Sequence, residues 1–322
     1  MDDKKPLIIL AGPTAAGKTA LSLELAKAIN GEIISADSMQ VYQGMDIGTA
    51  KLPENMRQGI KHYLIDCLSP KEEFNVVRFV ELAKEAIQNI CQKGKLPIVV
   101  GGTGFYIQAL LYDIDFTKND DDKSYRKELE KISKEQGAEA LHGMLKELDK
   151  TAAEEIHPHN IKRIIRALEF YKKSNGIKIS EHNREQRQKE SPYNFAYFVL
   201  TEERALLYER INTRVDEMLS EGLVEEVQRL LLEGVSRTGV SMQGLGYKEI
   251  AAYLCGEYTY EEAVYLLKRN TRHFAKRQLT WFRREPDVIW LERKKAEESG
   301  RTILGEIKRV LKEKEILERN SD

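Results

Sequence analysis

Hydrophobic residues in the first hundred positions alternate between short continuous runs and longer periodic stretches. The continuous runs predict buried strands at residues 7–11, 32–35 and 97–100. The periodic stretches predict helices at residues 20–29 and 76–91, each with apolar positions on one face. Strands that alternate with helices in this way are typical of βαβ units, so we predict a parallel sheet flanked by helices.

The pattern changes beyond Tyr112, where strand-like runs disappear and helical periodicity takes over. Two apolar stripes with helical spacing occupy positions 141, 144, 145 and 148, and positions 161, 164, 165 and 168. A strand-like run returns at residues 195–200. We therefore predict a catalytic core formed by residues 1–115 and 195–322, ending in helices, and a helical insertion domain at residues 116–194. A length of 322 residues fits about two domains.

A glycine-rich motif lies between the first predicted strand and the first predicted helix. Residues 12–19 read GPTAAGKT, which matches the P-loop pattern G-x-x-x-x-G-K-[ST] in its usual context. Such a loop turns backbone N–H groups toward a phosphate, and Lys18 adds a full positive charge. We predict a P-loop NTPase-like α/β fold. The expected diphosphate-binding residues are Gly12, Thr14, Ala15, Ala16, Gly17, Lys18 and Thr19.

The hydroxyl of Thr19 is suited to hold Mg²⁺ against phosphate oxygens, because Mg²⁺ prefers hard oxygen ligands. We therefore expect Mg²⁺ as the cofactor and Thr19 as its protein ligand. The sequence contains no apolar run of membrane-spanning length, and its first residues lack the apolar region of a signal peptide. The expected location is the cytoplasm, with no membrane partner.

Charge is distributed unevenly although the formal net charge is only -1. Residues 162–189 are strongly basic, and residues 268–284 carry seven Lys or Arg side chains and no acidic residue, interleaved with aromatic residues. Clusters of this composition suit a phosphate backbone with stacked bases, as in RNA recognition. The alternative interpretation is a pair of solvated helix faces.

Further candidate residues follow the ends of predicted strands, which meet at one rim of a parallel sheet. Asp37 can serve there as a general base or an indirect Mg²⁺ ligand, or it can simply form a turn. The GGTG turn at residues 101–104 allows close approach of a ligand or is only a tight connection. Arg210 and Arg214 lie four residues apart on one predicted helix face, where a cation would neutralise a departing diphosphate or join a surface ion pair.

No long apolar run ending in an acidic pair follows the P-loop. Residues 63–66 are the nearest candidate and are short. This favours a transferase that holds the phosphates of its substrate over an ATP hydrolase.

Several blocks together resemble the family of tRNA dimethylallyltransferases, which prenylate an adenosine beside the anticodon. The blocks span most of the chain: residues 12–26, 34–51, 62–70, 94–111, 157–171, 210–227, 242–249 and 276–283. The resemblance implies dimethylallyl diphosphate as donor and Mg²⁺ as cofactor. It also implies that the acceptor is the N6 amine of the tRNA adenosine immediately 3′ of the anticodon.

The resemblance also implies residue roles. The P-loop would hold the donor's diphosphate, Asp37 would take a proton from the amine, Thr103 would help position the site, and Arg214 would stabilise the leaving diphosphate. The tRNA anticodon stem-loop would contact Asp37, Ser38, Met39, Gln40, Lys162, Arg163, Ile164, Ile165 and Arg166. We expect the protein to act as a monomer.

Three other functions remain open from the sequence. An adenylate isopentenyltransferase shares the P-loop and the aspartate but prenylates a free nucleotide, and it needs no tRNA-binding surface. A small-molecule P-loop kinase would use residues 116–194 as a lid. A non-catalytic RNA-binding protein would use the P-loop only as a nucleotide switch. The two basic segments favour the tRNA enzyme over the first of these.

Overall fold

The computed structural model describes residues 4–116, 124–292 and 302–317. The chain divides into two compact units. The larger unit joins Met1–Leu111 to Pro192–Asp322, and the smaller unit is Tyr112–Ser191. Its junctions lie a few residues from those expected at 116 and 194, and each unit is described below by itself.

The larger unit is built on one six-stranded sheet in which all strands are parallel, in the order β3-β2-β4-β1-β5-β6. The strands are β1 (Lys5–Ala11), β2 (Gly31–Ser35), β3 (His62–Tyr63), β4 (Leu96–Gly101), β5 (Tyr193–Thr201) and β6 (Val288–Glu292). In the central strand β1, the side chains from Leu7 to Ala11 are fully buried. An apolar run covered on both faces is typical of a central parallel strand, and the predicted α/β class is confirmed.

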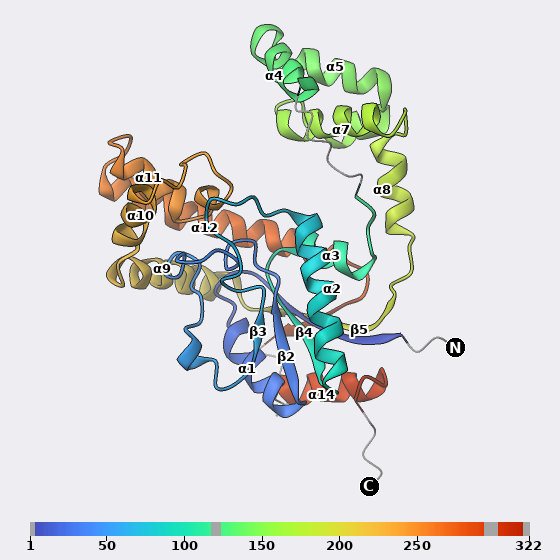
Figure 1. The fold of residues 1–322 in the computed structure, drawn as a ribbon, viewed down its shortest axis with the longest axis vertical. Helices are drawn as coiled ribbons and strands as arrows, with labels where there is room; N and C mark the ends of the chain where they lie inside the picture. Colours follow the sequence, from blue (N-terminus) through green and yellow to red (C-terminus); the bar gives the residue numbers. More distant parts are fainter. Residues whose placement is uncertain (1–3, 117–123, 293–301, 318–322) are drawn as a thin grey trace. The chain divides into compact units, whose positions relative to one another are not determined.

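Helices cover both faces of this sheet (Figure 1). On one face, α1 (Lys18–Ala28) and α14 (Ile303–Glu313) pack in a core that includes Leu25, Phe198 and Leu311. The helices α2 (Val76–Gln92) and α3 (Gly104–Leu111) pack together, and α2 contacts β2 and β4. Burial of these apolar stripes is the main force that fixes the helices on the sheet.

A second group of helices belongs to the same unit. It comprises α9 (Arg204–Ser220), α10 (Leu223–Leu232), α11 (Tyr247–Leu254) and α12 (Tyr260–Phe282), with the short 3-10 turns η1 (Glu54–Met56) and η2 (Ser241–Gln243). The long helix α12 begins at a capping box in which Thr259 and Glu262 satisfy each other's backbone N–H groups. It packs against α9, α11 and α3, so it connects the outer helices with the sheet layer.

The smaller unit contains only helices among its described residues. They are α4 (Ser124–Gln136), α5 (Ala138–Leu148), α6 (Lys150–Glu155), α7 (Ile161–Lys173) and α8 (Ile179–Arg187). The predicted stripes of α5 and α7 form its core, with Leu141, Leu145, Ile164 and Leu168 at most 1% exposed. Within the described ranges of the whole chain, none of the helices is long and apolar enough to cross a membrane.

Two strands escape prediction from the sequence. β3 has only two residues, too few to show a pattern. β6 follows the basic end of α12 and was expected to be part of a purely helical C-terminal region. It pairs with β5 at the edge of the sheet, and four of its five residues are only half-buried. Residues 288–291 nevertheless read VIWL, a short run of apolar, β-prone residues, so the sequence does carry a local signal for this strand.

Candidate active site

The P-loop connects the end of β1 at Ala11 to the start of α1 at Lys18. Three of its residues have positive φ, with values of 150° at Gly12, 62° at Ala15 and 87° at Gly17. A Cβ atom at Gly12 would lie 2.5 Å from the carbonyl oxygen of Leu200, so the adjacent strand β5 leaves room for glycine alone. The loop is therefore shaped by its own backbone and its neighbouring strand before any ligand binds.

The side chain of Lys18 folds over the P-loop. Its Nζ donates hydrogen bonds to the carbonyl oxygens of Gly12 at 2.9 Å and Pro13 at 2.7 Å. Burial and the nearby charge of Arg214 lower the pKa of Lys18 to about 8, although Asp37 acts in the opposite direction. Within the described parts of the chain, this ammonium is hydrogen-bonded by neutral carbonyls alone and lies beside a second cation, an arrangement that favours an incoming anion.

Arg210 and Arg214 both lie on α9, as expected, but their environments differ. Arg214 on α9 is half-buried, and burial lowers its pKa while Asp37, Glu217 and Glu221 oppose that change. Arg210 instead forms a 2.5 Å ion pair with Glu202, which follows the end of β5. Arg214 is therefore the arginine that shares the P-loop's electrostatic environment, whereas Arg210 has a carboxylate partner of its own.

Asp37 lies two residues beyond the end of β2. Its Oδ1 accepts hydrogen bonds from the backbone N–H groups of Met39 at 2.8 Å and Gln40 at 3.4 Å. Its Oδ2 accepts none from the residues that the structure describes. The turn interpretation is therefore correct for one oxygen, which shapes the segment 37–40. The carboxylate also interacts electrostatically with Lys18 and Arg214, so a chemical role for its other oxygen stays a prediction.

The GGTG turn is crowded by the protein itself. An added Cβ would lie 2.4 Å from the carbonyl oxygen of Ala36 at Gly101, 2.1 Å from Nε2 of Gln278 at Gly102, and 2.2 Å from the indole of Trp281 at Gly104. Internal packing therefore explains these three glycines, and ligand approach is not needed for them. The carbonyl oxygen of Thr103 accepts from the N–H groups of Tyr106 and Ile107 at the start of α3, and its side chain is half-buried at the rim.

Two residues at this rim were not predicted. Gln278 on α12 accepts from the N–H of Thr14 at 3.0 Å and donates to the carbonyl oxygen of Gly102 at 2.9 Å, so it connects the P-loop to the GGTG turn. Burial, together with Tyr42 and Asp37, raises the pKa of Tyr106 to about 12. Both lie inside the blocks that carry the resemblance, and that placement was the only sequence signal available for them.

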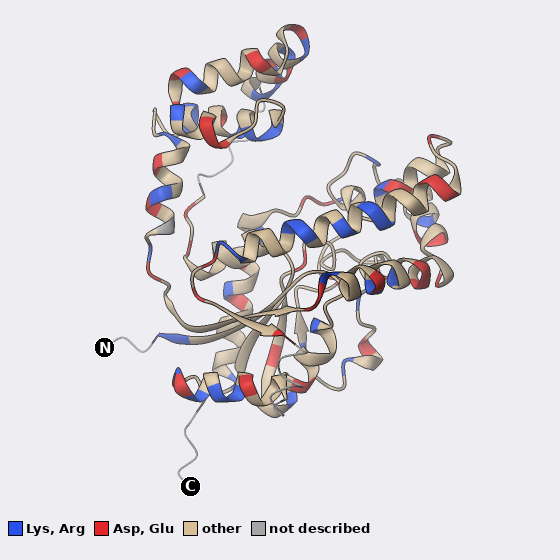
Figure 2. Ribbon diagram, turned by 180° about the vertical axis from the view of Figure 1, so that it is seen from behind, with Lys and Arg blue, Asp and Glu red and all other residues tan. Residues whose placement is uncertain are grey.

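The basic segment of α12 divides into two parts. Lys268 donates to Asp216 at 2.7 Å and Arg272 donates to Asn212 at 2.6 Å, so both side chains are held by α9. The cations toward the end of the segment are exposed: Lys276, Arg277, Arg283 and Arg284. Figure 2 shows basic residues recurring along this helix. The solvated-face interpretation therefore fails for the first part, where the cations fix helix packing.

In the smaller unit, the segment 162–166 also divides by burial. Lys162 and Arg163 are exposed and Arg166 is half-buried, whereas Ile164 and Ile165 are 0% and 4% exposed in the core of that unit. The two isoleucines position α7, and any side-chain contact with an RNA would come from the three cations. Of the five residues at 162–166 that were expected to contact tRNA, only Lys162, Arg163 and Arg166 are therefore placed to do so through their side chains.

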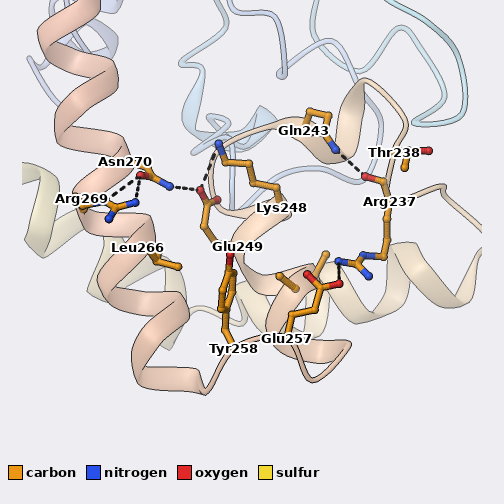
Figure 3. A pocket seen from close by; sticks show the side chains of 12 residues that line it. Arg237, Thr238, Gln243, Lys248, Glu249, Glu257, Tyr258, Leu266, Arg269 and Asn270 are labelled. Atoms are coloured by element: carbon orange, nitrogen blue, oxygen red, sulfur yellow. Dashed lines mark hydrogen bonds and ion pairs between the residues drawn. The ribbon is translucent and has the colours of Figure 1, made fainter. Parts of the chain in front are cut away.

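A cavity of about 610 Å³ lies between α11, α12 and the preceding loop (Figure 3). None of the predicted site residues lines it. Its charged groups already have partners, with Arg237 on Glu257 at 2.8 Å and both Lys248 and Asn270 on Glu249 at 3.5 and 2.8 Å. The cavity is thus separate from the P-loop chemistry.

The described residues include no group of three or more His, Cys, Asp or Glu side chains arranged to hold a metal ion. Hard oxygens come from two segments: the exposed hydroxyl of Thr19 belongs to the P-loop, and the carboxylate of Asp37 follows β2. This donor set fits Mg²⁺ when a bound diphosphate and water supply the remaining ligands.

Comparisons with known proteins identify the family of this chain. A family model described as IPP transferase matches residues 40–285. The chain is 63% identical to a tRNA dimethylallyltransferase of Lachnoclostridium phytofermentans, over 97% of this chain and 99% of that protein. It is 53% identical to a protein of the same name from Acetivibrio thermocellus, over 89% of this chain and 91% of that protein.

Solved structures give the same result. The full-length tRNA isopentenylpyrophosphate transferase from Bacillus halodurans matches with a TM-score of 0.71 and 44% identity, over 98% of this chain and 99% of that one. A eukaryotic dimethylallyltransferase acting on tRNA matches with a TM-score of 0.76 and 30% identity, over 95% of this chain and 78% of that one. The resemblance drawn from the sequence blocks is confirmed, and the chain belongs to the IPP transferase family, together with the bacterial tRNA dimethylallyltransferases.

Proposed function

We propose that this protein transfers a dimethylallyl group from dimethylallyl diphosphate to the N6 amine of the tRNA adenosine immediately 3′ of the anticodon, releasing diphosphate. The observation that carries the proposal is the meeting of Lys18, Arg214 and Asp37 at the P-loop. Two cations and one carboxylate there leave a net positive charge. Such a site favours a diphosphate and retains a base for its acceptor.

The reaction forms a bond between N6 and the allylic carbon and breaks the bond between that carbon and the diphosphate oxygen. Negative charge grows on the departing diphosphate, and the P-loop N–H groups with Lys18 and Arg214 stabilise it. The amine must lose a proton as the new bond forms, and Oδ2 of Asp37 receives it directly or through a water molecule. Different residues therefore act on the two difficult parts of the reaction. Asp37 makes the weakly nucleophilic amine reactive, and Lys18 and Arg214 stabilise the anionic leaving group.

Mg²⁺, when bound, would neutralise diphosphate charge, with Thr19 as its protein ligand. Thr103, at the start of α3, helps to position the reacting groups in this proposal. Segment 37–40 presents Asp37, Ser38, Met39 and Gln40 to the acceptor nucleotide. The adenosine must leave its base stack to react. Exposed cations of α7 in the smaller unit and, separately, exposed cations at the end of α12 in the larger unit bind phosphates of the anticodon stem-loop in this proposal.

We also propose that the protein acts as a monomer and is located in the cytoplasm. Electrostatic contact with the RNA backbone makes affinity depend on salt, so weaker binding at higher ionic strength is expected. The relatives named for action on tRNA support RNA as the acceptor class, and the two basic surfaces support it independently.

The experiment is transfer of labelled prenyl from dimethylallyl diphosphate, with Mg²⁺, to an unmodified anticodon stem-loop or to AMP. We expect label on the RNA from wild type and little from Asp37→Ala. Label on AMP alone would establish the nucleotide-prenylating activity instead. Transfer to neither acceptor, with γ-phosphate transfer from ATP to a small molecule, would establish a kinase. Full RNA binding without any turnover would establish a nucleotide-switched binding protein.

A further inference from the structure

We infer that Glu226 is a positioning residue for the reaction, because it anchors the loop that holds the Asp37–Gln40 segment in place. The inference rests on the proposed function for its effect on turnover. Glu226 lies in the first turn of α10 and is only 7% exposed. No Lys or Arg among the described residues forms an ion pair with it, which is unusual for a buried carboxylate.

Both oxygens of Glu226 are fully used by neutral donors. Oε2 accepts from the backbone N–H groups of Asp46 and Ile47, each at 2.9 Å. Oε1 accepts from the N–H of Gly48 at 3.1 Å and from the hydroxyl of Tyr247 at 2.6 Å. Three successive N–H groups of one loop therefore converge on a single carboxylate that belongs to a distant helix.

The anchored loop leads back to the candidate base through a short series of hydrogen bonds. The carbonyl oxygen of Thr49, next to the anchored residues, accepts from Nε2 of Gln40 at 3.2 Å. Gln40 in turn donates its backbone N–H to Oδ1 of Asp37. A shift of residues 46–49 would therefore move the side chain that sits beside Asp37, while the P-loop would keep its own contacts to Gln278 and β5.

The space around the anchor is closed as well. A Cβ atom at Gly48 would lie 2.6 Å from ring atoms of Tyr247, which is itself fully buried. Burial and the charge of Glu226 raise the pKa of Tyr247, so its hydroxyl stays protonated and donates. Close packing and directed hydrogen bonds thus fix one position of the loop.

The loop needs a carboxylate at position 226, because both side-chain oxygens must accept hydrogen bonds and an amide has only one oxygen. A glutamine accepts hydrogen bonds with one oxygen only, and its NH₂ group would face at least one backbone N–H of the loop. In the better orientation, Tyr247 could accept from the NH₂ group, yet the N–H of Gly48 would still lose its acceptor. A buried donor left without an acceptor is costly, so the loop is expected to detach in part.

The test compares Glu226→Gln with Glu225→Gln, the same change at the adjacent, exposed position of the same helix. Three quantities are measured on the full chain: kcat/KM for the anticodon stem-loop, affinity for inorganic pyrophosphate, and amide hydrogen exchange of residues 46–48. For Glu226→Gln we expect kcat/KM to fall roughly tenfold to a hundredfold, since small displacements of reacting groups have effects of that size. Pyrophosphate affinity should stay unchanged, and exchange at residues 46–48 should accelerate.

Equal kcat/KM in the two variants would overturn the inference, and so would a parallel loss of pyrophosphate affinity, which would indicate general damage to the fold. If Glu226→Gln does not fold, Tyr247→Phe removes one of the four donors and should show the same pattern to a smaller degree. A wild-type protein that prenylates no RNA would refute the proposed function. In that case the exchange rates of residues 46–48 would still support or overturn the anchoring itself.

Discussion

Two acidic residues lie near opposite ends of strand β2, Glu32 within the strand and Asp37 two residues beyond it, and their environments are opposite. Near the amino end, Glu32 accepts from the hydroxyl of Tyr63 at 2.8 Å, from Lys93 at 3.0 Å and from Lys95 at 2.8 Å. Burial would raise the pKa of Glu32, but these hydrogen bonds outweigh it and hold the value at about 2. Beyond the carboxyl end, Asp37 uses one oxygen for a turn and keeps the other near Lys18 and Arg214.

The comparison teaches how to tell a structural charge from a functional one. The Glu32 cluster is complete, so a ligand would gain nothing there and the cluster contributes stability. The cluster at the other end has two cations, Lys18 and Arg214, and burial together with the charge of Arg214 lowers the pKa of Lys18. Among the residues that the structure describes, the ammonium of Lys18 donates only to carbonyl oxygens. The positive charge of this cluster exceeds its negative charge, and a bound diphosphate would supply the missing anion. Its charged groups are therefore available for binding and catalysis.

Replacing Asp37 should have the largest effect on activity. In Asp37→Asn, the amide oxygen still accepts from Met39 and Gln40, so the turn persists while the proton acceptor is lost. We expect the rate of transfer to fall by about a hundredfold or more, as is common when a general base is removed. Single-turnover kinetics measures the rate, and the urea midpoint should not change. A rate within about tenfold of wild type would argue against Asp37 as the base.

The two arginines of α9 provide the next contrast. Arg214→Ala should lower kcat by roughly a hundredfold, because it removes a cation that stabilises the leaving diphosphate. Arg210→Ala should have a much smaller effect, since Arg210 is paired with Glu202. Steady-state kinetics on both variants decides the matter, and equal losses would show that the two residues share the role.

Glu32→Gln should lower stability and keep activity, whereas Asp37→Asn should lower activity and keep stability. We expect the free energy of unfolding at neutral pH to fall by about 2 kcal/mol while activity per folded molecule is retained, because a buried network is broken far from the rim. The pKa of Glu32 is lowered from 4.5 to about 2, so its contribution is present above 4.5 and is lost as pH falls toward 2. Urea unfolding across that range should show a weaker pH dependence in the variant. Glu24→Gln, an exposed change on α1, is the control.

The smallest expected effect is a pH dependence at Lys18. Because its pKa is lowered to about 8, the free protein loses the ammonium charge as pH rises above that value. Pyrophosphate binds the charged form, so its affinity should fall by up to about tenfold per pH unit beyond that point. Calorimetric titrations of wild type and Lys18→Arg measure this, because arginine stays charged. The same slope in both proteins would assign the pH dependence to the ligand.

The sequence predicted the parts of the molecule that depend on neighbouring residues. The P-loop, the two striped helices α5 and α7 of the smaller unit and four of the six strands follow from local spacing and periodicity. The four observed strands extend the expected ones by one or two residues at an end. β6 also carries a local signal, the apolar run VIWL at residues 288–291, but its pairing with β5 depends on the folded chain.

Contacts between distant residues could not be predicted in the same way. Thr14 and Gln278 are 264 residues apart in the chain, and Glu226 is 178 residues from Gly48, so only the folded chain brings them together. Helical spacing does not distinguish Arg210 from Arg214. In the folded chain, Arg210 pairs with Glu202, whereas Arg214 is half-buried and interacts electrostatically with Lys18 and Asp37. Burial similarly separates Ile164 and Ile165 from the cations beside them.

The most direct test of the central claim maps the product. An unmodified tRNA anticodon stem-loop is incubated with dimethylallyl diphosphate, Mg²⁺ and the protein, then digested and analysed by mass spectrometry. We predict one prenyl group on the adenosine immediately 3′ of the anticodon, formed with release of diphosphate. Prenylation at another nucleotide, or an unmodified stem-loop from a protein that still binds pyrophosphate, would contradict the account.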